Sequence, residues 1–239
     1  HGGWILGGVL AVIAAAGTAE FYRLAERGAV RAFRVPGVLA AASIVLVAAA
    51  WPVAAETAPV FWRLVVVLLL ALLAGAIWAR GVDGKPLHAV AVTLVGALYA
   101  GGTLTYALFL RHLLDAGPGQ LPVGGGPGPE WIGGALLAFP LVLTWVNDSA
   151  GYFIGKRWGR HRLAPRVSPN KSIEGSVAGV VLAVPTGAAY GSLVLEAWAG
   201  LPVGAVAGAV GGALVAVAAQ VGDLAESVLK REAGVKDSG

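Results

Sequence analysis

The residues best suited to do chemistry lie near the C-terminal end of the sequence, directly after a long apolar stretch. On a helix, four of them fall at i, i+3, i+4 and i+7 and share one face: Asp223, Glu226, Ser227 and Lys230. A charged stripe at the end of a membrane-spanning segment is costly unless it binds a charged partner. The stripe therefore predicts a binding or catalytic site.

This stripe combines groups that suit a metal ion with groups that suit phosphate. Carboxylate oxygens such as those of Asp223 and Glu226 favour Mg²⁺. Asp237 adds a further carboxylate, and cations stand beside it at Lys230, Arg231 and Lys236. Such groups serve nucleotide-phosphate transfer, which depends on positioning and charge stabilisation. The alternative is an ordinary amphipathic helix end with a Glu226–Lys230 pair, which leaves Asp223 unexplained.

Two adjacent polar residues interrupt the apolar stretch 135–155. Asn147 and Asp148 lie inside it, and an ionisable residue in a span is a candidate functional residue. Gly151, Tyr152 and Gly155 share a helical face with Asp148, so the two glycines leave room for a ligand or for another helix. The alternative is a structural aspartate paired with a nearby basic residue.

A basic loop over 157–171 leads into the next apolar stretch. It ends in Ser168-Pro-Asn-Lys171, and Glu174-Gly175 follow where a helix should begin. A helix N-terminus beside Lys and Ser side chains is a natural site for phosphate. The alternative is a solvated loop that attracts anionic lipid headgroups.

The composition is that of an integral membrane protein, since 57% of the 239 residues are hydrophobic and 13% are charged. We predict an all-α, polytopic transmembrane helix bundle that forms one domain over 1–239. Its segment 1–130 carries few motifs, and 131–239 carries the catalytic spans and loops. About seven spans are expected, at 4–19, 36–55, 59–79, 87–111, 131–155, 175–197 and 201–221.

Basic residues give the predicted orientation. With seven spans, 15 of the 17 Lys and Arg residues fall in loops on one side, the exceptions being Arg63 and Arg111. The positive-inside rule then places the N-terminus outside and the C-terminus in the cytoplasm. We interpret the net charge of +4 as this bias rather than as nucleic-acid binding.

Small residues recur at four-residue spacing in the last span, at Gly204, Gly208 and Gly212. This pattern allows helix backbones to approach closely, within the chain or between two copies in a homodimer. The sequence contains no cysteine, which excludes disulfides, thiolate metal sites and a cysteine nucleophile.

Together these residues resemble the CDP-diacylglycerol synthase (phosphatidate cytidylyltransferase) family. The similarity is dense over 145–239 and thin before it. The family signature contains Ser-x-apolar-Lys-Arg, four residues and Lys-Asp-x-Gly, and the chain has Ser227-Val-Leu-Lys230-Arg231 and Lys236-Asp237-Ser-Gly239. Further similar motifs are Gly222-Asp-Leu-x-Glu-Ser227, Asn147-Asp148-x-x-Gly-Tyr152, Gly155-Lys-Arg-x-Gly159 and Ser168-Pro-x-Lys171-x-x-Glu174-Gly175.

The resemblance implies a reaction in which the phosphate of phosphatidate attacks the α-phosphorus of CTP. The products are CDP-diacylglycerol and pyrophosphate, and Mg²⁺ is required. On this basis Asp223 and Asp148 are expected to ligate Mg²⁺, and a second cation, monovalent or divalent, is left open. The expected catalytic residues are Asp223, Glu226, Ser227, Lys230, Lys236 and Asp237. The expected substrate-binding residues are Asn147, Asp148, Tyr152, Ser168, Lys171, Glu174 and Arg231.

The family pattern continues beyond Gly239 with Pro-Gly-His-Gly-Gly and an Asp-Arg-x-Asp element, which is expected to complete the metal site. Expected partners are CTP, phosphatidate and anionic membrane lipid, with the active site on the cytoplasmic side of the inner membrane. Three alternatives stay open. They are a related CTP-dependent transferase or kinase acting on a polyprenol, phytol or archaeal ether lipid; an ion-coupled transporter using Asp148 and Asp223; and a structural lipid-binding protein.

Overall fold

A computed structural model describes residues 2–116 and 128–235 of the chain. The described residues form two compact units, 2–116 with 232–235 and 128–231. Almost every element in both units is a helix, which confirms the predicted all-α membrane bundle. The prediction that 1–239 forms a single domain stays a prediction.

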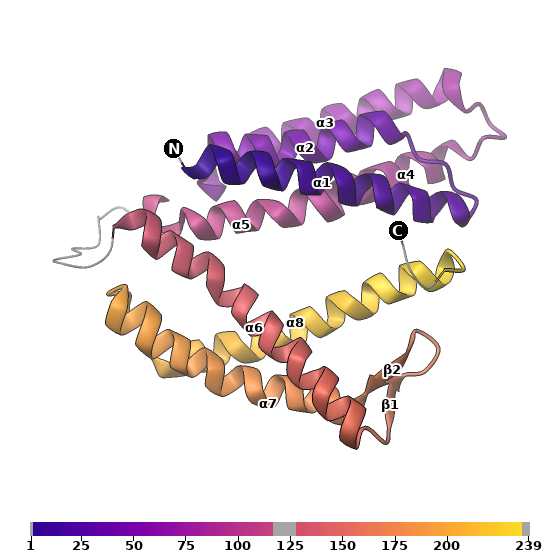
Figure 1. The fold of residues 1–239 in the computed structure, drawn as a ribbon. Coiled ribbons are helices and arrows are strands. Elements are labelled where there is room, and N and C mark those ends of the chain that lie inside the picture. Colours follow the sequence, from indigo (N-terminus) through magenta and orange to yellow (C-terminus); the bar gives the residue numbers. More distant parts are fainter. Residues whose placement is uncertain (1, 117–127, 236–239) are drawn as a thin grey trace. The chain divides into compact units, whose positions relative to one another are not determined.

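The first unit is a group of antiparallel helices (Figure 1). It comprises α1 (Gly2–Arg27), α2 (Arg34–Ala50), α3 (Ala54–Ala79), α4 (Pro86–Ala97) and α5 (Thr103–Arg111). A π-helical turn, η1 (Leu98–Gly102), joins α4 to α5, and a short 3₁₀ turn, η2 (Leu113–Ala116), follows α5. The buried Tyr22 hydroxyl donates to the Thr93 carbonyl oxygen at 2.6 Å, so even the polar contacts here serve helix packing.

The second unit contains α6 (Pro129–Trp158), α7 (Ile173–Ala189), the π-helical η3 (Tyr190–Trp198) and α8 (Ala205–Glu232). Leu143, Ala183 and Ala216 form a buried cluster that joins α6, α7 and α8. As predicted, the apolar stretch of α8 and the charged stripe form one continuous helix. Figure 1 shows these elements in red to yellow.

A β-hairpin lies between α6 and α7, and its two strands were not predicted from the sequence. Strands β1 (Arg162–Ala164) and β2 (Ser168–Ser172) pair antiparallel, with Arg162 opposite Ser172 and Ala164 opposite Ser168. The segment was predicted to be a basic loop. Pro165 and Pro169 oppose helix here because proline lacks the N–H that a helix interior needs.

Six helical stretches among the described residues are long and apolar enough to cross a membrane, against about seven predicted. They are Gly3–Arg27, Ala54–Ala79, Pro86–Arg111, Glu130–Trp158, Ile173–Trp198 and Ala205–Glu232. The expected span 36–55 is instead the 17-residue helix α2. It ends at Ala50 because Trp51 precedes Pro52, and a residue before proline disfavours helical dihedrals. The first span is longer than predicted, since α1 continues to Arg27.

Candidate active site at the hairpin and the C-terminal helix

An ion pair brings together two of the motifs that were predicted to carry function. The Lys171 ammonium on β2 contacts the Asp223 carboxylate on α8. The Lys171 side chain is 25% exposed and that of Asp223 is 54% exposed, so solvent and a ligand can reach the pair. The structure thus unites the Ser168–Lys171 segment with the C-terminal stripe.

Strand β2 and the end of α8 make a second contact further along. Arg231 Nε donates to the carbonyl oxygen of Val167 at 3.1 Å, just before β2 begins. Lys171 to Val167 spans about 13 Å of extended chain. Asp223 to Arg231 spans about 12 Å of helix. The two elements therefore run beside each other over matched lengths, and the stripe lies along the hairpin.

The charged stripe itself is ordered by one local pair. Lys230 Nζ lies 2.7 Å from Glu226 Oε1, one helical turn away. The Ser227 side chain is half-buried on the same helix. This confirms the i, i+4 pair that the sequence suggested and places Glu226 and Lys230 on the helix that carries Asp223. Lys236 and Asp237 lie outside the described residues.

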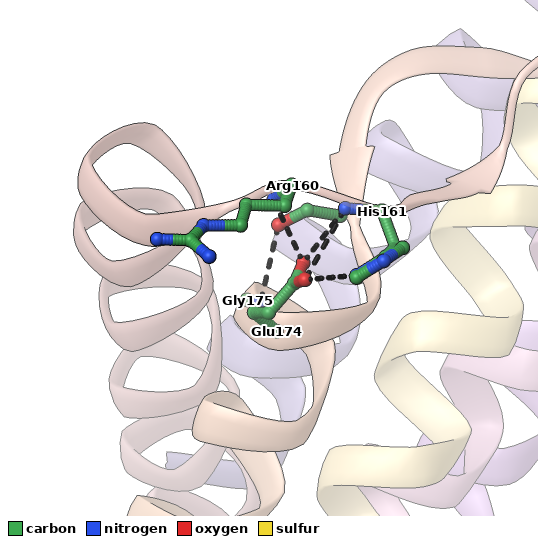
Figure 2. Close-up of polar contacts among 5 residues, drawn as sticks. Arg160, His161, Glu174 and Gly175 are labelled. Carbon is green, nitrogen blue, oxygen red and sulfur yellow. Dashed lines mark hydrogen bonds and ion pairs between the residues drawn. The ribbon is translucent and has the colours of Figure 1, made fainter.

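Glu174 fastens the start of the hairpin to the start of α7 (Figure 2). Its carboxylate accepts hydrogen bonds from the backbone N–H of Arg160 at 3.1 Å and of His161 at 3.2 Å. His161 Nδ1 lies 2.6 Å from Glu174 Oε1. Figure 2 shows the Arg160 guanidinium pointing away from this carboxylate. Through these contacts Glu174 holds the backbone before β1 against the first turn of α7. Its predicted role in substrate binding stays a prediction.

Ser172 completes this junction by capping α7. Its hydroxyl oxygen accepts the backbone N–H of Gly175 at 3.1 Å, which satisfies one of the donors that a helix N-terminus leaves unpaired. A side chain at position 175 would not fit, since an added Cβ would lie 2.6 Å from the carbonyl oxygen of Gly151 and 3.1 Å from Gly155 Cα. The glycines of α6 thus make room for α7 rather than for a ligand.

An amide network joins α6, α7 and α8 one turn before Asp223. Asn147 on α6 is 2% exposed, and its Nδ2 donates to Asp148 Oδ1 at 3.0 Å. Gln220 Nε2 on α8 donates to Asn147 Oδ1 at 2.8 Å and to the Ser176 carbonyl oxygen at 2.9 Å. Gln220 was not predicted from the sequence. An amide in an apolar span, three residues before a key aspartate, was the signal that could have revealed it.

Tyr152 lies apart from this network. The residue is 59% exposed, the Lys156 ammonium lies 5.6 Å from the ring centroid, and Lys156 Nζ donates to the Tyr152 hydroxyl at 3.5 Å. Tyr152 shares α6 with Asn147 and Asp148, but no contact joins it to the ion pair among the residues that the structure describes. Its expected part in substrate binding is untested.

The donor set fits Mg²⁺ only if the substrate supplies part of the coordination. Within residues 2–116 and 128–235, no group of three or more His, Cys, Asp or Glu side chains converges. Mg²⁺ is commonly held by one or two carboxylates together with substrate phosphates and water. Asp223, half exposed and carried on α8 with Glu226, meets that requirement. Asp148 as a second ligand stays a prediction.

The fold and this site define a class of protein: a multi-pass membrane protein with paired acidic and basic groups where its helices end. The chain belongs to the cytidylyltransferase family, whose sequence model matches residues 1–239.

Three curated relatives are similar to this chain over 61–74% of its length. A phosphatidate cytidylyltransferase of Brucella suis is 35% identical over 182 residues, which cover 74% of this chain and 61% of that protein. The enzyme of the same name from Synechocystis is 35% identical over 162 residues, covering 63% and 53% of the two chains. The one from Bacillus subtilis is 31% identical over 145 residues, covering 61% and 46%. The chain thus spans about three fifths of the length of the Brucella relative.

Proposed function

We propose that the protein transfers the cytidylyl group of CTP to phosphatidate, forming CDP-diacylglycerol and pyrophosphate. The observation that carries the proposal is the ion pair between Lys171 and Asp223. It joins two motifs that are distant in sequence, and each suits one part of a phosphoryl-transfer site. Family membership and the names of the similar proteins point to the same reaction.

In this reaction an oxygen of the phosphatidate phosphate attacks the α-phosphorus of CTP. A new P–O bond forms there, and the bond from the α-phosphorus to the oxygen bridging to the β-phosphorus breaks. Its electron pair leaves with pyrophosphate. Both reactants carry several negative charges, so the protein must supply cations and donors near the reacting phosphorus.

The basic and hydroxyl groups of the site serve this need. Lys171 and Lys230 bind phosphate oxygens of CTP or phosphatidate, and Ser168 and Ser227 donate hydrogen bonds to them. In the structure, Lys171 and Asp223 neutralise each other. We infer that the phosphates replace Asp223 as the partner of Lys171 when CTP binds. Mg²⁺, held by Asp223 with Glu226 and the phosphates, would neutralise charge that develops on the phosphate oxygens.

The position of the site along the helices suits its two substrates. Asp223 follows the apolar stretch of α8, and Lys171 lies just before α7 begins. CTP can arrive from water there, while the phosphate of a lipid lies at the membrane surface. The distribution of basic loops supports the cytoplasmic face of the inner membrane as the side of the site.

A substrate panel tests the proposal. The protein at its natural full length, purified in detergent with Mg²⁺, is given one lipid at a time and CTP labelled either in the α-phosphate or, in a parallel reaction, in the γ-phosphate. Phosphatidate should yield labelled CDP-diacylglycerol and one equivalent of pyrophosphate. If labelled product forms only with a polyprenol, with phytol or with an ether lipid, and not with phosphatidate, the protein is a different CTP-dependent lipid transferase or kinase. Ion flux in sealed vesicles without CTP use would favour a transporter.

A further inference from the structure

The contact between α7 with its extension η3 and α8 is made of small residues on both sides. Facing positions are Gly187 and Gly191 on one side and Gly208 and Gly212 on the other. A Cβ added at Gly191 would lie 2.9 Å from Gly208 Cα, and one added at Gly212 would lie 3.0 Å from the Ala183 carbonyl carbon. The helices therefore touch backbone to backbone.

A contact between two rows of small residues does not by itself set how far α8 is shifted along α7. The small residues recur every four positions, at 179, 183, 187 and 191 on one side and at 204, 208, 212 and 216 on the other. If α8 slid by four residues, small residues would again face small residues. That slip moves α8 by about 6 Å along its axis. It would carry Asp223 away from Lys171.

Gln220 distinguishes these registers. Its amide Nε2 donates to Asn147 Oδ1 on α6 at 2.8 Å and to the Ser176 carbonyl oxygen on α7 at 2.9 Å. A slip of one turn that carries position 220 toward Leu143 and Val180 would put the amide beside apolar side chains and away from both acceptors. A buried polar residue is known to fix register in packed helices for this reason.

We propose that Gln220 is a positioning residue, which sets the register of α8 against α6 and α7 and thereby holds Asp223 opposite Lys171. Asp223 follows Gln220 by three positions, which is less than one helical turn. Among the described residues, the half-buried amide of Gln220 is thus the last hydrogen-bond contact between α8 and both α6 and α7 before the site. Only the expected effect on turnover rests on the proposed function.

Crosslinking reads the register directly, because the chain has no cysteine of its own. Lys171→Cys is combined in turn with Asp223→Cys, Ala219→Cys and Ser227→Cys, and a short bifunctional thiol reagent is added to membranes. The Lys171–Asp223 ion pair is absent in all three pairs, so the comparison isolates Gln220. With Gln220 present, the 171–223 pair should react fastest. With Gln220→Leu, the 171–219 or 171–227 pair should become at least as reactive as 171–223.

Ala218→Leu, at an exposed position on α8, is the matched control and should keep the 171–223 preference. An unchanged preference in Gln220→Leu would overturn the proposal. If Gln220→Leu does not fold, Gln220→Met replaces it. Failure of both variants to fold would show that the amide is needed for the fold itself rather than for register, which also overturns the proposal.

Turnover gives a second readout. In a chain with Lys171 and Asp223 intact, Gln220→Leu should lower kcat for CTP about 100-fold, the scale of loss expected from a displaced catalytic group. KM should change less, and Ala218→Leu should leave both unchanged. An unaltered kcat in a folded Gln220→Leu protein would count against the proposal. If the parent protein makes no CDP-lipid, the proposed function fails, yet the crosslinking result still decides the role of Gln220.

Discussion

At the scale of single residues, two carboxylates of the same unit have different surroundings. Asp223 is half exposed and pairs with the Lys171 ammonium, a cation that a phosphate can also bind. Glu174 is held by backbone N–H groups and by His161, and these partners belong to the fold. Exposed ion pairs contribute at most about 1 kcal/mol to stability, so the Lys171–Asp223 pair matters for charge placement.

Loss of the Glu174 carboxylate should loosen the start of the hairpin. Glu174→Ala removes the acceptor for the backbone N–H groups of Arg160 and His161, so hydrogen exchange at these two amides should accelerate several-fold. Glu174→Gln keeps an oxygen acceptor and should show a smaller change. Exchange measured by mass spectrometry on peptides covering 159–162 checks this. Unchanged protection in Glu174→Ala would contradict the architectural role.

The residue types of the site could be predicted better than their contacts. Asp223, Glu226 and Lys230 stand at helical spacing in one stretch, so local periodicity was sufficient to group them. The approach of Lys171 to Asp223 depends on the hairpin and on packing among three helices, which no local pattern encodes. Gln220 was missed for the same reason, since its acceptors are on α6 and α7.

At the scale of elements, close backbone packing brings the helices of the second unit together. An added Cβ at Gly208 would overlap the Gly187 carbonyl oxygen and lie 3.0 Å from Gly191 Cα. Gly222 on the same helix has no atom within 4 Å of such a Cβ. The spacing of Gly204, Gly208 and Gly212 predicted close packing, and the structure confirms it within the chain. A homodimer stays a prediction.

This difference yields a paired prediction. Gly208→Ala should destabilise the protein by about 1–3 kcal/mol, because the backbones must separate to admit the methyl group. Gly222→Ala should be neutral or slightly stabilising, since alanine is the better helix former. Thermal unfolding of both variants in the same detergent measures the change. Equal losses, or no loss in Gly208→Ala, would contradict this close packing.

At the scale of the whole chain, helix length and loop charge together constrain the topology. Six helical stretches of the described residues can cross a membrane by length and composition. The predicted orientation needs α2 to cross as well. Its 17 residues give a length of about 26 Å, close to the hydrocarbon thickness of a bilayer. The number of spans was thus predictable within one. The exact count depends on whether α2, whose length is close to the minimum for a span, crosses the membrane.

Single cysteines in this cysteine-free chain can decide the orientation. Arg31→Cys, Lys85→Cys and Arg166→Cys should react with a membrane-impermeant thiol reagent only from the cytoplasmic side. Pro52→Cys, between α2 and α3, should react only from the outside. Labelling of Arg31→Cys and Pro52→Cys from the same side would show that α2 does not cross. Labelling of Arg166→Cys from outside would place the proposed site on the wrong side for CTP.

The proposed function depends on Asp223 and Lys171 forming the active site of a CTP-dependent lipid enzyme. The sharpest test compares the full-length parent protein with Asp223→Asn in the conversion of radiolabelled CTP and phosphatidate, with Mg²⁺ present. We predict that Asp223→Asn lowers turnover by about two orders of magnitude or more, while thermal unfolding changes little because the lost pair is partly exposed to solvent. Near-parental turnover in a folded Asp223→Asn protein would contradict this assignment.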